Sequence, residues 1–134
     1  MKVFLDTNVL VDITANREPF SKWAIKLVNE AKNGKFELYT STLSILTTYY
    51  LMEMQLGDRK CKRILNIILN RVKTQDIDHQ GLLTGITSKF RDYEDAVQHE
   101  CARRIPGIRY IVTRNKKDFK YSVIETVSPE ELFV

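Results

Sequence analysis

MKVFLDTNVLVD, residues 1–12, places an acidic residue directly after a short apolar run. Val3-Phe4-Leu5 has the length and composition of a buried strand. Asp6 interrupts the apolar stretch and no small-residue cleavage site follows, so we predict a first strand here rather than a signal peptide. The next residues, Asn8 to Thr14, favour a short helical turn. A strand that passes directly into a helix is the opening unit expected of an α/β domain.

Strand-like and helix-like segments alternate along the rest of the chain. A helix is expected between Pro19, which suits a first turn, and Gly34, which suits a helix end. Apolar periodicity and turn residues predict the remaining elements. They are a strand at Phe36–Thr40, helices at Leu43–Met54 and from Asp58 onward, a strand at Lys73–Ile77, helices at His79–Ser88 and Tyr93–Arg104, strands at Arg109–Thr113 and Val123–Val127, and a final turn capped by Ser128. This alternation predicts a single α/β domain over residues 1–134, with a central, mostly parallel sheet.

The helix expected at Leu43–Met54 has an apolar side made of Leu43, Leu46, Tyr50 and Leu51. We expect most of this side to be buried in the core of the domain, although part of it could contact a partner. Asp58 is expected to cap the helix that follows.

The composition is that of an ordinary globular protein. The chain has 134 residues, of which 43% are hydrophobic and 28% are charged, and this balance excludes a disordered chain. No apolar run approaches the ~20 residues that a membrane-spanning helix requires. Because Cys61 and Cys101 are too few for a disulfide scaffold, we expect both in the core and the protein in the reducing cytoplasm. The net charge of +4 permits a polyanionic partner without requiring one.

Acidic residues follow the predicted strands at the places where α/β sheets form their sites. Asp6 follows the first strand, and Asp118 lies beyond the strand at Arg109–Thr113. Such positions face the crevice outside the carboxyl ends of the strands. Asp92 and Asp95 stand three residues apart at a helix start, so they share roughly one face. Purely structural interpretations stay open: Asp6 could cap its turn, and Asp92 could be an N-cap with Asp95 at N3.

Three or four acids in one crevice would form a site of hard oxygen ligands. Mg²⁺ and Mn²⁺ prefer such ligands, and Mg²⁺ commonly binds one or two carboxylates together with phosphate oxygens and water. This chemistry suits phosphodiester hydrolysis, because the metal polarises the phosphate and lowers the pKa of the attacking water.

Three segments together resemble the signature segments of PIN domains. They are LDTNVLVD at 5–12, DYEDAVQ at 92–98 and IVTRNKKDF at 111–119. The order and spacing are most similar to those of small single-domain PIN proteins that include the VapC-type toxins. The resemblance implies a three-layer α/β/α fold and a Mg²⁺- or Mn²⁺-dependent endoribonuclease. It also implies the toxin of a toxin–antitoxin pair, with a cognate antitoxin, RNA as substrate and a homodimeric state.

The resemblance assigns roles to individual residues. Asp6, Asp95 and Asp118 would bind the metal, with Asp92 assisting them in catalysis. Family members vary over whether the position of Asn115 or that of Asp118 carries the last carboxylate, and here only the second does. Asn8 and Thr113 resemble the small polar residues that orient the acids or a phosphate. Independently of the resemblance, Arg114, Lys116 and Lys117 form a basic run beside the expected site. In a nuclease this run could hold RNA phosphates, with Arg114, Asn115 and Lys116 as the expected substrate-binding residues, although such a run is also typical of a solvated turn.

One position departs from the PIN pattern. These nucleases generally carry a Glu near the start of the helix after the second strand, and Thr47 stands at that position. The loss of one carboxylate weakens the expected metal affinity. A second hypothesis is therefore a catalytically weak or inactive PIN domain that binds RNA or protein. A flavodoxin-like or receiver-type domain also uses acids after strands, but the sequence has no Gly-rich phosphate loop.

His99 stands four residues after Asp95. We expect it either to hydrogen-bond that acid or to lie on the helix surface. Neither His79 nor His99 has a cysteine at zinc-binding spacing.

Overall fold

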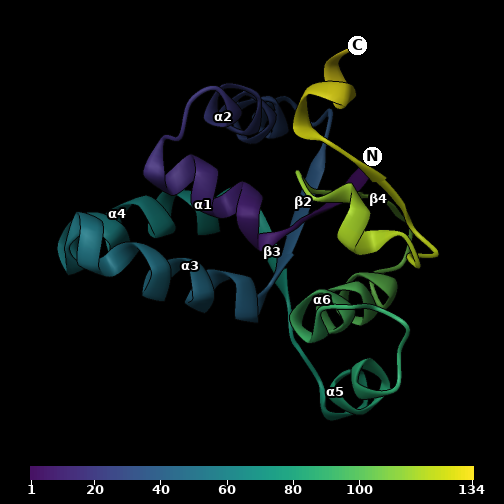
Figure 1. Cartoon of the computed structure of the whole chain (residues 1–134). Coiled ribbons are helices and arrows are strands. Elements are labelled where there is room, and N and C mark those ends of the chain that lie inside the picture. Colours follow the sequence, from purple (N-terminus) through teal and green to yellow (C-terminus); the bar gives the residue numbers. More distant parts are fainter.

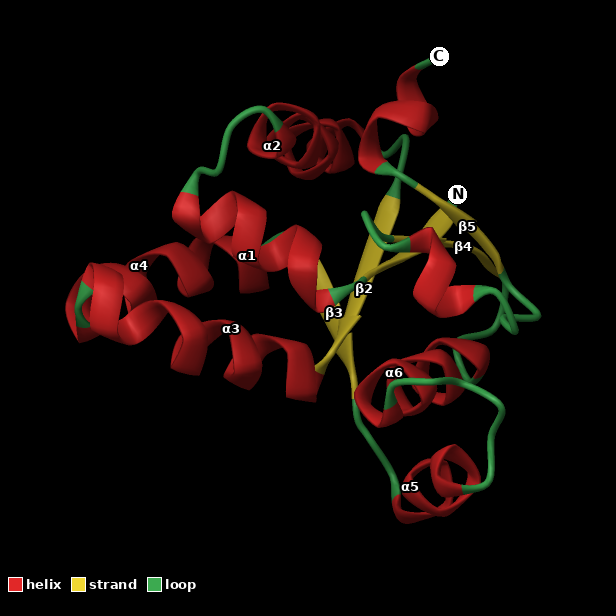
Figure 2. Ribbon diagram, in the orientation of Figure 1, coloured by secondary structure: helices red, strands yellow, loops and turns green.

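Five parallel strands form the centre of the molecule. The computed structural model describes residues 1–134. Its strands are β1 (Lys2–Leu5), β2 (Glu37–Ser41), β3 (Val72–Gln75), β4 (Ile108–Val112) and β5 (Glu125–Val127). They are arranged in the order β3-β2-β1-β4-β5, and every neighbouring pair is parallel. Figure 2 shows the sheet between two groups of helices. The predicted α/β fold is confirmed.

Helices cover both faces of this sheet in a three-layer arrangement (Figure 1). One layer contains α1 (Thr7–Ala15), α2 (Phe20–Glu30), α3 (Thr42–Leu56) and α4 (Asp58–Leu69), and the other contains α5 (His79–Ile86) and α6 (Tyr93–Arg103). Three short 3₁₀ segments are η1 (Ala31–Asn33), η2 (Lys116–Phe119) and η3 (Pro129–Phe133). None of the helices is both long enough and apolar enough to cross a bilayer.

The strand order explains the two helical layers. From β1 the chain moves to β2 and β3 through α1–α4, and then returns through α5 and α6 to β4 on the other side of β1. Crossovers between parallel strands are right-handed, so a reversal of direction along the sheet moves the helices to the opposite face. The reversal leaves a crevice outside the carboxyl ends of β1 and β4.

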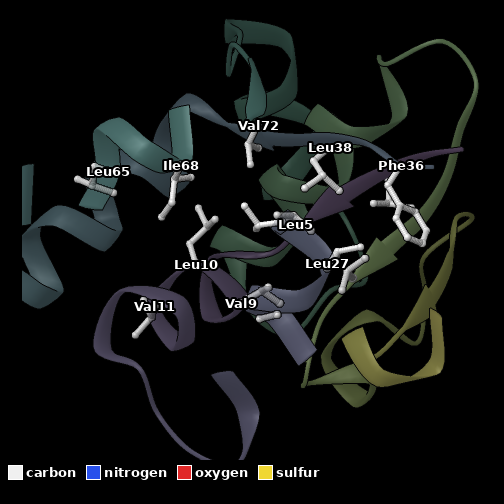
Figure 3. Close-up of a cluster of buried hydrophobic side chains, with 14 of the residues drawn as sticks. Leu5, Val9, Leu10, Val11, Leu27, Phe36, Leu38, Leu65, Ile68 and Val72 are labelled. Carbon is white, nitrogen blue, oxygen red and sulfur yellow. The ribbon is translucent and has the colours of Figure 1, made fainter. Parts of the chain in front are cut away.

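Alternate residues of β1 belong to two separate cores. Val3 and Leu5 pack with residues of α1, α2 and α4 in the larger cluster, part of which is drawn in Figure 3. Phe4 points to the other face and packs with Cys101 and Ile111, as the alternation of side chains along a strand requires. Burial on both faces of the sheet explains why Val3, Phe4 and Leu5 of β1 are all apolar.

The burial expected for the apolar side of α3 is wrong. Leu46, Tyr50 and Leu51 are 57%, 73% and 59% exposed, respectively, whereas Ser44 and Thr48 are buried. Small polar residues occupy the inner positions because their hydroxyls find partners close by: Thr48 donates to the carbonyl of Ser44 at 2.7 Å. The fold therefore leaves an apolar face of α3 uncovered.

The helix after Gly57 also begins differently from the expectation. Gly57 is the N-cap of α4 and Asp58 is its first helical residue, so the predicted capping role of Asp58 is wrong. Its carboxylate accepts the hydroxyl of Tyr49 at 2.6 Å and pairs with Lys62 at 3.1 Å. The charge still lies in the first turn, where the helix dipole favours an acid.

Candidate functional site

Acidic side chains from separate parts of the chain line one pocket beyond the carboxyl ends of β1 and β4. Asp6 follows β1, Asp92 and Asp95 lie at the start of α6, and Asp118 lies in η2. All four line a pocket of about 300 Å³, together with a fifth acid, Glu94, which the sequence motifs did not single out. The other lining residues are Thr7, Asn8, Val11, Arg17, Thr47, Leu51 and Asn115. The fold thus brings together acids that lie as far apart as positions 6 and 118.

Asp6 is buried, and both of its carboxylate oxygens accept hydrogen bonds. The backbone N–H of Thr7 donates to Oδ1 at 2.8 Å, and the hydroxyl of Thr113 donates to Oδ2 at 2.8 Å. The Thr113 oxygen is held in turn by the side-chain amide of Asn8 at 3.2 Å and the backbone N–H of Asn115 at 3.0 Å. Asp6 is also the N-cap of α1. The capping interpretation and the site interpretation therefore apply to the same side chain.

The surroundings of Asp6 disfavour its charged form. Burial raises its pKa from 3.8 to about 6, against the lowering effect of the bonds from Thr113 and Thr7, and repulsion from Glu94 and Asp118 raises it further. None of the ion pairs in the protein includes this carboxylate. A buried acid without a counter-charge is unfavourable, and a cation bound beside it would relieve this cost.

The start of α6 presents two acids to the pocket. Asp92 is the N-cap of α6 and its Oδ1 accepts the backbone N–H of Asp95 at 3.0 Å, which is the capping geometry expected for this pair. Asp95 is half-buried. Burial raises its pKa to about 7, with repulsion from Asp6, Asp92 and Asp118 as further causes. The mutual repulsion indicates that the acids of the pocket lie within electrostatic range of one another.

Thr47 lies on α3 and lines the same pocket without contributing a charge. The next acid of this helix, Glu53, is not among the lining residues. The pocket therefore holds a hydroxyl at the position where the PIN pattern has a carboxylate.

A buried polar network behind the pocket escaped sequence analysis. The side-chain amide of Gln98 donates to the Ser44 hydroxyl at 2.8 Å and to the Thr7 hydroxyl at 3.3 Å. The Ser44 and Thr7 hydroxyls are themselves 2.8 Å apart, and Ser41 donates to Ser44 at 3.0 Å. The network joins the first turns of α1 and α3 to α6, so it fixes the walls that carry Asp6, Thr47 and Asp95 relative to one another. No periodicity indicates it, because its members come from three helices.

The basic run after β4 does not face the pocket. Arg114 donates from Nε and Nη2 to the two carboxylate oxygens of Asp12, at 2.5 and 3.1 Å, and its guanidinium lies 4.1 Å from the ring centre of Phe20. Lys116 pairs with Glu131 at 2.6 Å. Neither Arg114 nor Lys116 lines the pocket, whereas the neighbouring Asn115 does. Both cations are engaged in pairs within the chain, which revises their expected position beside the acids.

The cation that does line the pocket is Arg17, which the sequence motifs did not indicate. Its Nε lies 3.3 Å from Oδ1 of Asp12, and its backbone N–H donates to the Asp12 carbonyl at 3.0 Å. Asp12 is 1% exposed and is thus shared by two arginines. The sequence offered one signal, the acid Asp12 six residues after Asp6. Its partners could not be inferred, because Arg17 and Arg114 lie five and 102 residues further along the chain.

His99 lies in neither of its two expected places. It is buried, its Nε2 accepts the backbone N–H of Val123 at 3.1 Å, and its ring centre lies 4.9 Å from that of Phe90. Burial lowers its pKa, which favours the neutral ring that this acceptor role requires. Both expectations for His99 are wrong because its imidazole supports the segment before β5.

The donor set suits a hard divalent cation. Every acid of the pocket offers carboxylate oxygens and no thiol or imidazole lines it, which is the ligand chemistry of Mg²⁺ and Mn²⁺. No three acidic, histidine or cysteine side chains stand close enough to enclose an ion by themselves. The arrangement fits a cation held by one or two carboxylates and completed by water and phosphate oxygens.

Solved structures share this fold at low sequence identity. The VapBC2 complex from Rickettsia felis, bound to a promoter DNA fragment, aligns with a TM-score of 0.69 and 17% identity over 96% of this chain and 98% of that chain. VapC20 from Mycobacterium tuberculosis, a Sarcin-Ricin loop cleaving toxin, aligns with a TM-score of 0.70 and 17% identity over 92% of this chain and 97% of that chain.

Sequence comparison is more specific. Ribonuclease VapC1 of Aquifex aeolicus (strain VF5) is 32% identical over 136 residues, which cover 97% of this chain and 92% of the relative. A family model described as "PIN domain" matches residues 2–117. This match spans every residue of the acidic pocket except Asp118, and with the parallel sheet and the relative it shows that the chain belongs to the PIN-domain family.

Proposed function

We propose that this protein is a divalent-metal-dependent endoribonuclease and the toxin of a toxin–antitoxin pair. The observation that carries the proposal is the convergence of Asp6, Asp95 and Asp118 in one pocket, where the pKa values of Asp6 and Asp95 are raised. The 32% identity to a protein named ribonuclease VapC1 supports RNA as the substrate. The buried, unbridged Cys61 and Cys101 are compatible with action in a reducing cytoplasm.

Each residue of the pocket has a proposed task. Asp6, Asp95 and Asp118 would bind Mg²⁺ or Mn²⁺, one or two of them directly and the rest through bound water, with Asp92 assisting. Such an ion, when bound, neutralises charge on the phosphate and lowers the pKa of the attacking water. Thr113 and the N–H of Thr7 hold the Asp6 carboxylate in one orientation. The amides of Asn8 and Asn115, which line the pocket, are placed to donate to phosphate oxygens.

The proposal is tested by cleavage of a mixed RNA substrate by the purified protein with Mn²⁺, Mg²⁺ or EDTA. We expect cleavage by the wild type that EDTA abolishes. Asp6→Asn should reduce the rate at least about 100-fold, because the amide cannot bind a cation as a carboxylate does. Asp76→Asn is the matched control, since Asp76 is an exposed acid that does not line the pocket. Equal rates for wild type and Asp6→Asn would refute the proposed role of Asp6.

A second candidate function is a PIN domain that binds RNA or protein without cutting. The neutral Thr47 in the pocket wall favours it. Thr47→Glu separates the two functions, because an added carboxylate in an intact pocket should tighten Mn²⁺ binding by about tenfold, or about 1.4 kcal/mol. Calorimetric titration with Mn²⁺ measures this change. Metal-independent RNA binding without cleavage by either protein would favour the second function.

We also propose a cognate antitoxin and a homodimer as partners. The support is the uncovered apolar face of α3, where Leu46, Tyr50, Leu51 and Met54 are exposed, and surfaces of this kind are typical of protein contacts. Light scattering of the purified protein measures its mass in solution. Tyr50→Glu should convert a dimer to a monomer if this face is the interface, and an unchanged mass would assign the face to another contact.

A further inference from the structure

Arg17 is the one cationic residue among those that line the pocket, together with Asp6, Thr47 and Leu51. Arg114 and Lys116 of the basic run pair with Asp12 and Glu131 instead. Positive charge beside the acids therefore comes from the end of α1.

The side chain of Arg17 is held at one end and free at the other. Its Nε pairs with the buried Asp12 at 3.3 Å, and its backbone N–H donates to the carbonyl of the same residue at 3.0 Å. Its guanidinium makes no hydrogen bond within the protein, and its one ion-pair partner is Asp12. A guanidinium whose Nε is fixed presents its remaining N–H groups as a planar fork, which is the geometry that binds a phosphate.

The charge balance around Asp12 leaves the positive charge of the Arg17 guanidinium uncompensated. Asp12 carries one negative charge, and Arg114 already engages both of its carboxylate oxygens. Arg17 is the second cation on that single carboxylate, and its side chain is 49% exposed. The cluster of Asp12, Arg114 and Arg17 thus has one surplus positive charge, located on the residue that faces the pocket.

The distance from Asp6 separates Arg17 from the scissile phosphate. Arg17 is anchored at the level of Asp12, six residues after Asp6 along α1, or about 9 Å along the helix axis at 1.5 Å per residue. Val11 on α1 and Leu51 on α3 also line the pocket. A phosphate bound by the acids and a phosphate bound by Arg17 are therefore different phosphates of one strand.

We infer that Arg17 binds a backbone phosphate of the RNA that neighbours the scissile phosphate. This inference rests on the proposed ribonuclease function and adds a substrate contact to it. Arg17 contributes to the affinity for a strand of several nucleotides and is not required for cleavage itself. A substrate with a single phosphate would not reach it.

The first test measures the salt dependence of RNA binding in the Asp6→Asn background, which keeps the RNA intact. Fluorescence anisotropy of a labelled single-stranded RNA at several salt concentrations gives log Kd against log salt. Arg17→Ala should weaken binding about 5-fold and lower the slope by about 0.7, the value for one lost phosphate contact on a single strand. Arg17→Lys should keep most of the slope. Lys60→Ala, which removes an exposed lysine of α4 that does not line the pocket, is the control. An unchanged slope for Arg17→Ala would overturn the inference.

The second test uses cleavage with Asp6 intact. With a long RNA, Arg17→Ala should raise KM several-fold and leave kcat within about 2-fold, because the contact is equal in ground state and transition state. With a dinucleotide, whose only phosphate is the scissile one, the variant and wild type should cleave equally. Equal loss on both substrates would place Arg17 at the scissile phosphate instead. If the wild type cleaves neither RNA, the ribonuclease proposal itself fails, and the salt slopes still decide whether Arg17 binds phosphate.

Discussion

Two buried carboxylates, Asp6 at the N-cap of α1 and Asp12 within α1, have opposite surroundings. Asp12 lies between the guanidinium groups of Arg114 and Arg17. Asp6 has no cation beside it and accepts hydrogen bonds only from the neutral donors Thr7 and Thr113. They lie six residues apart in one segment of sequence, and both are nearly inaccessible to solvent.

The difference distinguishes a structural carboxylate from the carboxylate that we propose binds the metal. A buried charge that is balanced by fixed cations holds elements together, and Asp12 joins α1 to the turn after β4 that carries Asn115. A buried charge that is left unbalanced costs stability, and either protonation or a bound cation relieves this cost. Asp6, repelled by Glu94 and Asp118, is of this second kind. Proteins retain such unfavourable groups where function requires them.

The largest effect on stability is expected for Asp12→Ala. It leaves Arg114 and Arg17 without their shared partner, and breaking a buried ion pair typically costs 3–5 kcal/mol, so we expect a loss of about 3 kcal/mol in the free energy of unfolding. Urea denaturation measures it. Asp12→Asn should lose nearly as much, because the amide restores shape without charge. A loss below about 0.5 kcal/mol would contradict the structural role of Asp12.

The next effect is the pH dependence of the wild type without metal. The folded pKa of Asp6 is about 6 against 3.8 for an ordinary Asp, and that of Asp95 is about 7. At these two carboxyl groups the folded state therefore binds more protons than the unfolded state between pH 4 and 7, so their contribution to stability falls as pH rises through this range. A pKa shift of about 2 units at Asp6 corresponds to about 3 kcal/mol.

Thermal unfolding in EDTA at pH 5 and at pH 7.5 tests this dependence, with Mn²⁺ added in parallel samples. Mn²⁺ should raise the Tm more at pH 7.5, because protons compete with the metal for the same carboxylates at pH 5. A change of Tm with pH in EDTA that is the same in the wild type and in Asp6→Asn would contradict the unbalanced state of Asp6.

Asp6→Asn should have a smaller effect, of opposite sign to that of Asp12→Ala. Removing the uncompensated charge should stabilise the metal-free protein at pH 8 by about 1–2 kcal/mol. The gain is less than the pKa shift of Asp6 alone implies, because the new amide must donate to Thr113 Oγ1, which already accepts from Asn8 and Asn115. Urea denaturation in EDTA at pH 8 and pH 4.5 measures the difference, which should shrink at the lower pH. Destabilisation at pH 8 would show that Asp6 is structural, like Asp12.

A still smaller effect is expected for Arg114→Lys, and the smallest for Lys116→Ala. An ammonium keeps the charge opposite Asp12 but loses the two-pronged contact and the stacking on Phe20. We expect a loss of about 1 kcal/mol in urea denaturation. Lys116→Ala, which removes only the exposed pair with Glu131, should change stability by less than about 0.5 kcal/mol. Equal effects for the two variants would show that the Asp12 cluster is no stronger than a surface pair.

Much of the fold was predictable because its signals are local. The run Val3-Phe4-Leu5 predicted β1, and the structure extends it by only one residue, Lys2. The rule for sites in parallel sheets was enough to expect Asp6 and Asp118 in one crevice, where the pocket now places them. The resemblance to PIN domains added the family, which the match over residues 2–117 confirms.

The errors concern choices that depend on neighbours distant in sequence. The apolar side of α3 was expected to be buried, but Ser44 and Thr48 occupy the buried positions. Thr7 and Gln98 provide hydrogen-bond partners for Ser44, whose carbonyl accepts from Thr48. Arg114 was expected beside the acids, but it pairs with Asp12 and does not line the pocket. The pattern of hydrophobic residues along one helix does not predict which polar side chains a neighbouring helix will supply as partners.

The sequence by itself determined the alternation of strands and helices, the acids after the strands and the absence of a carboxylate at Thr47, because these depend on residue type and spacing along the chain. Only the tertiary structure decided which charges are balanced. Asp6 and Asp12 are the same residue type in one short segment, and what distinguishes them is the arrival of Thr113 beside one and Arg114 beside the other. That pairing follows from β4 lying next to β1, since electrostatic interactions act between groups that are close in space.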